Sequence, residues 1–187
     1  MLLYEDIITG AEMFSDAFPV KEVDGIVYEV DCAMITIKEG DVDIGANPSA
    51  EEQEEGTDSS AQTVNNVIHS FRLQQMNFDL ASWKAHIKGY MKNIKEKIPE
   101  GGREREEFER GATAYAKKII TLHKKDKDGG TNYEFYIGDG DWIITDENEQ
   151  DEAKKQKEGM VALLNYREDG VTPYFTFWKH GLKQVKL

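Results

Sequence analysis

The sequence predicts an α+β fold in which short β-strands flank a pair of amphipathic α-helices. Short runs near both ends are rich in β-branched and aromatic residues, as strands are. Between residues 78 and 123 the apolar residues recur every three or four positions, which is typical of helices. A Pro-Glu-Gly-Gly stretch at 99–102 divides this region in two. Because 187 residues suit one domain, we expect a single domain over residues 1–187.

The N-terminal part predicts strands at residues 2–4, 17–20, 26–30 and 34–37. We expect the last two to pair as a hairpin, because only a short connection separates them. From residue 64 to 73 apolar side chains alternate with polar ones, which predicts a further strand.

Residues 39–60 differ from their surroundings in composition. They contain eight acidic residues and no Lys or Arg, and apolar residues are nearly absent after Ile44. Such a segment cannot bury enough apolar surface to offset the entropy lost on ordering. We therefore expect a mobile acidic loop over 39–60.

The two helices are predicted to form an antiparallel hairpin over residues 79–124. Asp79 is the expected N-cap of the first helix, and residues 99–102 end it. The second helix runs from 103 to about 123. Gly111 lies beside its apolar stripe and either permits close approach or weakens the helix. The apolar stripes of the two helices are Trp83, Ile87, Tyr90, Met91, Ile94 and Ile98, and Phe108, Ala112, Tyr115, Ile119 and Leu122.

The C-terminal part returns to strand patterns. Residues 133–137 are expected to pair with 142–144 across a Gly-Asp-Gly turn. Residues 139–158 form an extended connection, and its part from 146 onward has no apolar period and is expected to be a loop. The remaining strands are expected at 160–166, 174–178 and 182–185.

Composition excludes several classes of protein. A net charge of −13 argues against a general nucleic-acid binder. Cys32 is the only cysteine, so we expect no intrachain disulfide, no zinc site of CxxC type and a reducing compartment, the cytoplasm. No apolar run is long enough for a membrane span, and the N-terminus does not resemble a signal peptide. No phosphate-binding GxxxxGK[ST] motif is present, so we expect no bound nucleotide.

No set of residues suits catalysis. The four histidines, at 69, 86, 123 and 180, are scattered, and no GxSxG motif accompanies them. We expect that the protein is not an enzyme.

The helical hairpin has a basic character that the rest of the chain lacks. Residues 79–127 contain 13 Lys and Arg against 8 Asp and Glu, a net +5, whereas the remainder carries 10 against 28, a net −18. Lys84, Lys88, Lys92 and Lys95 line one side of the first helix. Such a face favours docking on an acidic surface, either of a partner or of the chain's own acidic loop. The alternative is an ordinary solvated helix face.

Several segments together resemble one protein family. They are residues 44–51 (IGANPSAE), 133–138 (YEFYIG), 159–174 (GMVALLNYREDGVTPY) and, at the N-terminus, 4–8 and 12–16. On these motifs the chain resembles the translationally controlled tumour protein family from end to end.

This resemblance implies a β-tent fold with a mobile acidic loop and a basic helical hairpin. The same β-tent occurs in a zinc-binding accessory protein of Rab GTPases and in R-type methionine sulfoxide reductases. The reductase function is not expected, because Cys32 lies far in sequence from the C-terminal strand that carries the nucleophile there.

The function implied by the resemblance is calcium binding and microtubule stabilisation within the regulation of growth and survival. The tubulin contacts would come from Lys84, Lys88, Lys92 and Lys95. The alternative is a regulator of a small Ras-like GTPase, acting through Glu12. The chain ends in Leu187 rather than in the cysteine common in vertebrate members, so we expect a monomer.

Calcium would bind weakly, because no EF-hand pattern is present. The candidate ligands are Asp139, Asp141, Asp146 and Glu147, all in the extended connection of residues 139–158.

Overall fold

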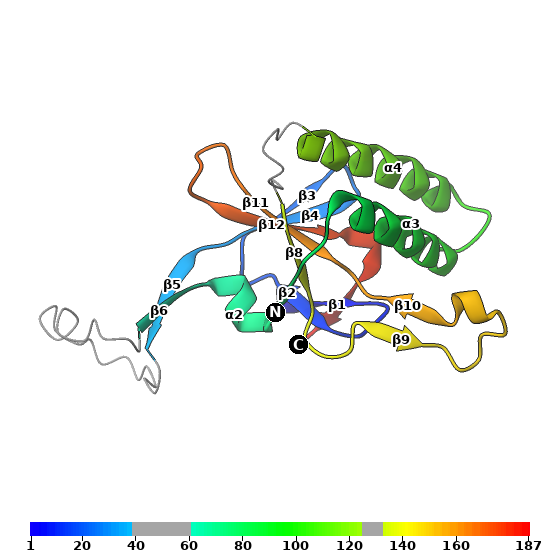
Figure 1. The fold of residues 1–187 in the computed structure, drawn as a ribbon, viewed down its shortest axis with the longest axis horizontal. Helices are drawn as coiled ribbons and strands as arrows, with labels where there is room; N and C mark the ends of the chain where they lie inside the picture. The colour runs from blue at the N-terminus through cyan, green and yellow to red at the C-terminus, as the bar shows by residue number, and fades with distance from the viewer. Residues whose placement is uncertain (39–60, 125–132) are drawn as a thin grey trace, which may run out of the picture.

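The computed structural model describes residues 1–38, 61–124 and 133–187, and Figure 1 shows its arrangement. The described residues form a sheet-rich core with a helical hairpin against it, which confirms the predicted α+β class. The expected acidic loop at 39–60 lies outside the described residues. That the chain forms one domain stays a prediction.

The largest sheet has six antiparallel strands in the order β3-β4-β12-β11-β8-β7. It joins strands from both ends of the chain, because β12 pairs with β4 on one side and with β11 on the other. Its strands are β3 (Val20–Val23), β4 (Val27–Asp31), β7 (Gln74–Met76), β8 (Glu134–Ile137), β11 (Ala162–Tyr166) and β12 (Pro173–Trp178).

The described residues also form three smaller sheets. The chain termini meet in a three-stranded sheet, β13-β1-β2, in which Leu2 pairs with Lys186. The β5-β6 ribbon points away from the rest of the molecule, and β9-β10 lies beside the hairpin (Figure 1). The bounds are β1 (Leu2–Asp6), β2 (Glu12–Ser15), β5 (Met34–Lys38), β6 (Ala61–Asn65), β9 (Ile143–Thr145), β10 (Gln156–Glu158) and β13 (Leu182–Lys186).

The helices of the described residues include the predicted hairpin. It consists of α3 (Leu80–Lys97) and α4 (Arg103–Lys124), and both agree with the sequence prediction. The short helical elements are α2 (Asn66–Phe71), η1 (Glu152–Lys154) and η2 (Lys179–Gly181).

A buried carboxylate ties the N-terminal strand to the start of β11. Asp6 accepts hydrogen bonds from the Ile8 N–H, the Thr9 hydroxyl and the Met160 N–H, at 2.8–2.9 Å. Asp6 and Met160 are separated by 154 positions in sequence, so this hydrogen bond joins distant parts of the chain. Burial nevertheless raises the pKa of Asp6, because desolvation outweighs these hydrogen bonds.

Two predicted hairpins are wrong. Strand β4 pairs with β3 and β12, whereas β5 pairs with β6, so residues 26–30 and 34–37 belong to different sheets. The Cys32 N–H donates to the Pro173 carbonyl, which keeps β4 beside β12 before the chain leaves the sheet. Likewise, β9 pairs with β10 rather than with β8.

Three other predictions need correction. The strand expected at 17–20 begins only at Val20, because the residues before it form a turn. The strand expected over 64–73 ends at Asn65, whose side chain accepts from the Val67 and Ile68 N–H groups and so begins helix α2. The segment expected to be a loop at 146–158 contains η1 and β10. Its end is a strand because residues 156–158 pair with β9.

Candidate functional site

Helix α3 turns its apolar face to the sheets and its lysines outward. Asp79 caps it as predicted, with its carboxylate accepting from the Ser82 N–H at 2.7 Å. Lys84, Lys88 and Lys92 are exposed, whereas Lys95 is half-buried. The buried residues of this helix are Trp83, His86, Ile87, Tyr90 and Ile94.

Helix α4 is held against the central sheet by close packing. The Tyr115 ring lies 5.7 Å from that of Trp178, and the Phe108 ring 4.7 Å from the imidazole of His180. A Cβ on Gly111 would lie 2.4 Å from Ile26 Cδ1, so this glycine permits close approach. Of the two interpretations of Gly111, the structure therefore supports the first.

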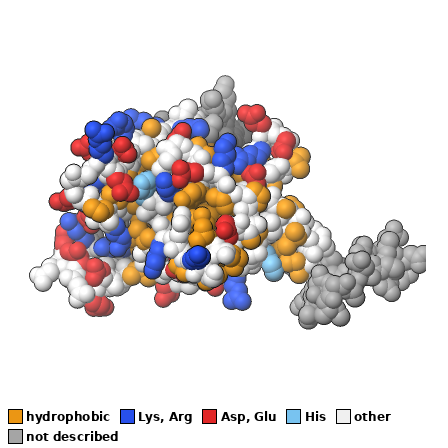
Figure 2. Space-filling view, turned by 180° about the vertical axis from the view of Figure 1, so that it is seen from behind, with side chains coloured by type: hydrophobic (Ala, Val, Ile, Leu, Met, Phe, Trp, Pro, Cys, Tyr) orange, Lys and Arg blue, Asp and Glu red, His pale blue; other side chains and the backbone are white. Residues whose placement is uncertain are grey.

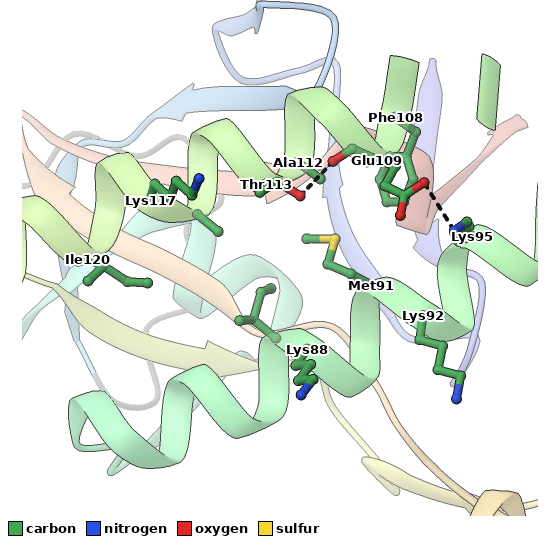
Figure 3. Close-up of a pocket in the computed structure, with 12 residues that line it drawn as sticks. Lys88, Met91, Lys92, Lys95, Phe108, Glu109, Ala112, Thr113, Lys117 and Ile120 are labelled. Carbon is green, nitrogen blue, oxygen red and sulfur yellow. Dashed lines mark hydrogen bonds and ion pairs between the residues drawn. The ribbon is translucent and has the colours of Figure 1, made fainter. Parts of the chain in front are cut away.

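Between the two helices lies a groove of about 570 Å³, which we call the hairpin groove. Figure 3 shows α3 on one side of it and α4 on the other. Its floor is apolar, and lysines from both helices stand at its rim. The lining residues are Ile87, Lys88, Met91, Lys92 and Lys95 of α3, and Phe108, Glu109, Ala112, Thr113, Ala116, Lys117 and Ile120 of α4.

One ion pair joins the helices across the groove. Lys95 Nζ lies 3.0 Å from Glu109 Oε2 (Figure 3). Arg105 also fixes the connection between the helices, because its guanidinium donates to the Ile98 carbonyl at 2.8 and 3.1 Å. The two walls of the groove are therefore held in a defined relation.

The structure separates the four predicted lysines into groups. Lys88, Lys92 and Lys95 line the hairpin groove, and Lys84 does not. In the space-filling view from behind, basic side chains gather along the upper edge, near the hairpin, with acidic ones among them (Figure 2).

Sequence reasoning counted the lysines of α4 in the charge of the hairpin but assigned none of them to the contact surface. Lys117 lies at the rim, two turns along from Glu109, and Thr113 stands between them. This four-residue spacing, parallel to that of Ala112, Ala116 and Ile120, was the signal that could have found it.

Glu12 lies elsewhere, on the edge of β2. It is exposed and lines a hollow of about 470 Å³ together with Gly10, Ser70, Phe71, Arg72 and Asp139. Arg72 lies 4.0 Å from Asp139 in this hollow. The structure thus brings one predicted calcium ligand to the predicted GTPase-binding residue.

The other calcium candidates do not meet at one point. Asp146 accepts from the Asn148 N–H at 3.0 Å and lies 3.7 Å from Lys157, while Asp141 and Glu147 are exposed. Within residues 1–38, 61–124 and 133–187, no group of three or more His, Cys, Asp or Glu is placed to hold a metal ion.

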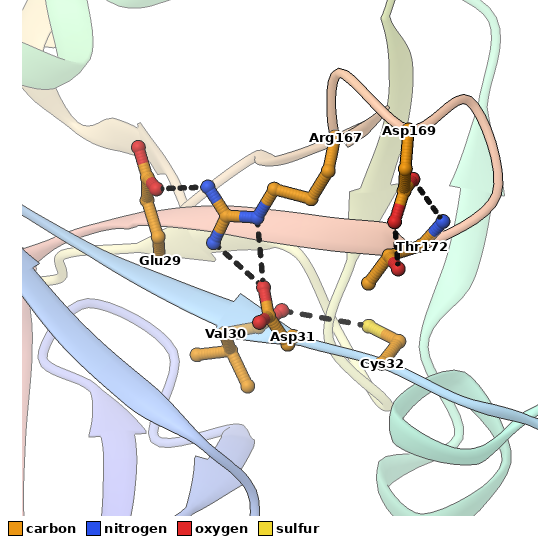
Figure 4. Close-up of polar contacts among 7 residues, drawn as sticks. All are labelled: Glu29, Val30, Asp31, Cys32, Arg167, Asp169 and Thr172. Carbon is orange, nitrogen blue, oxygen red and sulfur yellow. Dashed lines mark hydrogen bonds and ion pairs between the residues drawn. The ribbon is translucent and has the colours of Figure 1, made fainter.

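The resemblance motif around Arg167 has a structural role. The guanidinium donates to Asp31 at 2.6 and 2.9 Å and also to Glu29 (Figure 4). It also stacks 3.9 Å from the Tyr174 ring centre. Asp169 accepts from the N–H and hydroxyl of Thr172, and these bonds, with the N–H of Thr172 foremost, lower its pKa. The motif thus fastens the β11-β12 turn to β4.

The helices in the described part of the chain are too short or too polar to cross a membrane.

Comparisons with known proteins agree with this architecture. The family model described as "Translationally controlled tumour protein" matches residues 1–183. Homologues of that protein from Yarrowia lipolytica and Candida albicans are 53% and 50% identical to the chain, and each alignment covers 100% of both proteins.

Two solved structures are similar along the whole chain. The translationally controlled tumour-associated protein p23fyp from Schizosaccharomyces pombe is 48% identical with a TM-score of 0.72, at 100% coverage of both chains. The Caenorhabditis elegans protein, solved by NMR, is 29% identical with a TM-score of 0.63, and 100% and 99% of the two chains are covered. The chain therefore belongs to the translationally controlled tumour protein family, which supports a general role in growth regulation and is not known as a family of enzymes.

Proposed function

We propose that this protein acts in growth regulation by docking non-covalently on acidic protein surfaces through the outer face of α3, with tubulin as the partner. The observation that carries this proposal is the row of exposed lysines. Within the described part of the chain, Lys84, Lys88 and Lys92 form no ion pair, so their charges are available to a partner.

The chemistry of such a contact is electrostatic. Tubulin's acidic tails carry the opposite charge, and each exposed ion pair contributes roughly 0.2–1 kcal/mol. Several lysines acting together also steer the encounter, and salt screens both effects. Lys95 joins the contact once a partner's carboxylate replaces that of Glu109.

Microtubule co-sedimentation tests the proposal. The variant Lys84→Glu/Lys88→Glu/Lys92→Glu should lose pelleting, and wild-type pelleting should weaken as salt rises. The matched control is Lys21→Glu/Lys183→Glu/Lys186→Glu, which makes the same change of net charge at exposed lysines of β3 and β13. Equal loss in both variants would assign the effect to net charge, and equal pelleting of all three proteins would refute the role of α3.

Calcium binding belongs to the same proposal and is supported by the family resemblance. Exposed carboxylates of the 139–158 segment suit a hard cation. Two double variants, Asp139→Asn/Asp141→Asn and Asp146→Asn/Glu147→Gln, should differ in calorimetric titration with calcium if one pair supplies ligands. Wild-type affinity in both would exclude these four residues as ligands.

A GTPase contact is the second candidate, and the accessibility of Glu12 beside Arg72 supports it. The variant Glu12→Gln should then weaken binding to a small Ras-like GTPase and alter its nucleotide exchange rate. Glu168→Gln, at an exposed carboxylate of the β11-β12 turn, serves as the control. Unchanged binding by Glu12→Gln would remove this candidate.

A further inference from the structure

We infer that the hairpin groove binds one face of an amphipathic α-helix of a partner protein, with aliphatic side chains on that face and Asp or Glu along its flanks. The inference deepens the proposed function, since it rests on an acidic partner at α3 and adds the apolar chemistry by which the partner is recognised. It also assigns roles to residues of α4, which the lysine row of α3 does not involve.

The floor of the groove supplies the apolar half of this recognition. Phe108 and Ala112 are buried, while Met91, Ala116 and Ile120 are half-buried. Alanine at two successive turns of α4 leaves the space that a longer side chain would fill. A volume of about 570 Å³ lies in the range of roughly 300–1,000 Å³ found for ligand sites. Methionine suits such a surface, because its flexible side chain adapts to different apolar partners.

The rim supplies the charged half. Lys88 and Lys92 stand on the α3 side and Lys117 on the α4 side, so an occupant meets positive charge on both flanks (Figure 3). Glu109 is the acidic residue among the lining residues, and its carboxylate is paired with Lys95. This charge distribution selects an acidic occupant and disfavours a basic one.

The dimensions favour a helix over an extended acidic tail. From Ile87 to Lys95 the α3 wall rises about 12 Å, which matches two turns of a helix. A ligand helix presents side chains at i, i+3, i+4 and i+7 over that length, in the mode known for helices bound in grooves. A tail made only of charged residues would leave the apolar floor exposed to water.

The Lys95–Glu109 ion pair then acts as a competitor. A carboxylate of the partner that reaches Lys95 must displace Glu109, whose own charge also repels the ligand. The variant Glu109→Gln should therefore bind the acidic helix about two- to fivefold more tightly. If the ligand instead bound to a charged surface without this geometry, removing the charge of Glu109 would strengthen binding only slightly. The same small change would then follow from removing one acidic charge anywhere near the rim.

The test uses the full chain and a synthetic helical peptide of about 15 residues, with Leu at i, i+3, i+4 and i+7 and Glu on the flanks. Two control peptides are used. One has the same composition in scrambled order, and the other has Ser in place of each Leu. Binding is measured by fluorescence anisotropy, and contact by NMR of methionine methyl groups, of which Met91 lies in the groove.

We expect the leucine peptide to bind and to shift the Met91 methyl signal. Met91→Ser and Ala116→Phe, which remove an apolar contact and fill the space respectively, should each weaken binding roughly tenfold. Met34→Ser, at an exposed methionine of β5, should have no effect. Thermal unfolding of each variant shows whether it is folded. The methyl signals of the wild-type protein report contact of the peptide with the groove without any substitution.

Equal binding of the serine or scrambled peptide would overturn the inference and leave the lysine-face proposal standing. Binding of the leucine peptide by a protein that does not pellet with microtubules would support the groove and exclude tubulin as its partner. A shift of the Met91 signal with protein concentration alone, abolished in Ala116→Phe, would show that a second copy of this chain occupies the groove and would overturn the inference.

Discussion

The Nδ1 atom of His86 in α3 lies 3.7 Å from Oε1 of Glu158 in β10, which is too far for a hydrogen bond. The imidazole is nearly inaccessible to water and is surrounded by the rings of Phe78, Tyr90 and Trp142, with centroids 5.4–5.9 Å away. The helical hairpin and the β9-β10 ribbon therefore meet at a titratable group that has aromatic neighbours.

This contact predicts a pH-dependent stability. Burial lowers the pKa of His86 from 6.5 to about 4. Between these values the unfolded chain takes up a proton that the folded chain does not, so lowering the pH from 6.5 towards 4 destabilises the fold by up to about 3 kcal/mol. The variant His86→Phe should lose this dependence in urea unfolding at several pH values.

Two nearby carboxyl groups act in the opposite direction. Burial raises the pKa of both Glu158 and Asp6, so their protonation at low pH favours the folded state. Both are retained in His86→Phe, and the difference from wild type therefore isolates the imidazole. His69→Gln, at an exposed histidine of α2, is the control, and a pH slope in His86→Phe equal to that of wild type would contradict the prediction.

Two glycines of the hairpin should respond oppositely to alanine. In Gly111→Ala the added Cβ overlaps Ile26, so we expect a loss of about 1–3 kcal/mol in the free energy of unfolding. In Gly89→Ala the Cβ meets open space, and the higher helix propensity of alanine should stabilise the protein by about 0.5–1 kcal/mol. Chemical denaturation measures both, and a stabilised Gly111→Ala would show that α4 does not pack on Ile26.

Arg167 should not tolerate lysine. A lysine keeps the charge but cannot bind Asp31 through two nitrogens or stack in the same way on Tyr174. We expect Arg167→Lys to lower the free energy of unfolding by about 1–2 kcal/mol, since the site is partly exposed. Arg110→Lys, on the exposed face of α4, should be nearly neutral in the same measurement, and equal effects would contradict the proposed geometry.

The thiol of Cys32 should be unreactive in the folded protein. Burial raises its pKa to about 11, and the thiol donates weakly to the Val30 carbonyl at 3.6 Å. Reaction with a thiol reagent at pH 8 should therefore be at least about a hundredfold slower in buffer than in denaturant. Similar rates in the two conditions would show that β4 opens readily at its end.

Local patterns predicted the helical hairpin because a helix is specified by neighbours in sequence. The period of the apolar residues, the Asp79 cap and the glycines after Pro99 defined both helices without knowledge of any distant contact. Side-chain capping by Asn65 was an equally local signal for helix α2. The alternation of apolar residues over 64–73 nevertheless led to the prediction of a strand in its place.

Strand partners could not be predicted in the same way. Strand β4 pairs with β12, and β5 pairs with β6. Both partners lie outside residues 26–37, and nothing in those residues specifies which strand each will pair with. Hairpin pairing was the natural expectation for adjacent strands, and it failed where another strand supplied the backbone hydrogen bonds instead, as β12 does for β4 and β10 does for β9.

For the site, the sequence by itself determined which charges the hairpin carries and that Lys84, Lys88, Lys92 and Lys95 share a side of one helix. Only the tertiary structure decided how they are used. The packing of α4 against α3 sets Lys117 opposite Lys88, pairs Lys95 with Glu109 and leaves an apolar floor between them. Helical periodicity fixes a residue's direction from its own helix axis. The position of α4 depends instead on contacts between distant parts of the chain, such as that of Gly111 with the Ile26 side chain, which form only in the folded protein.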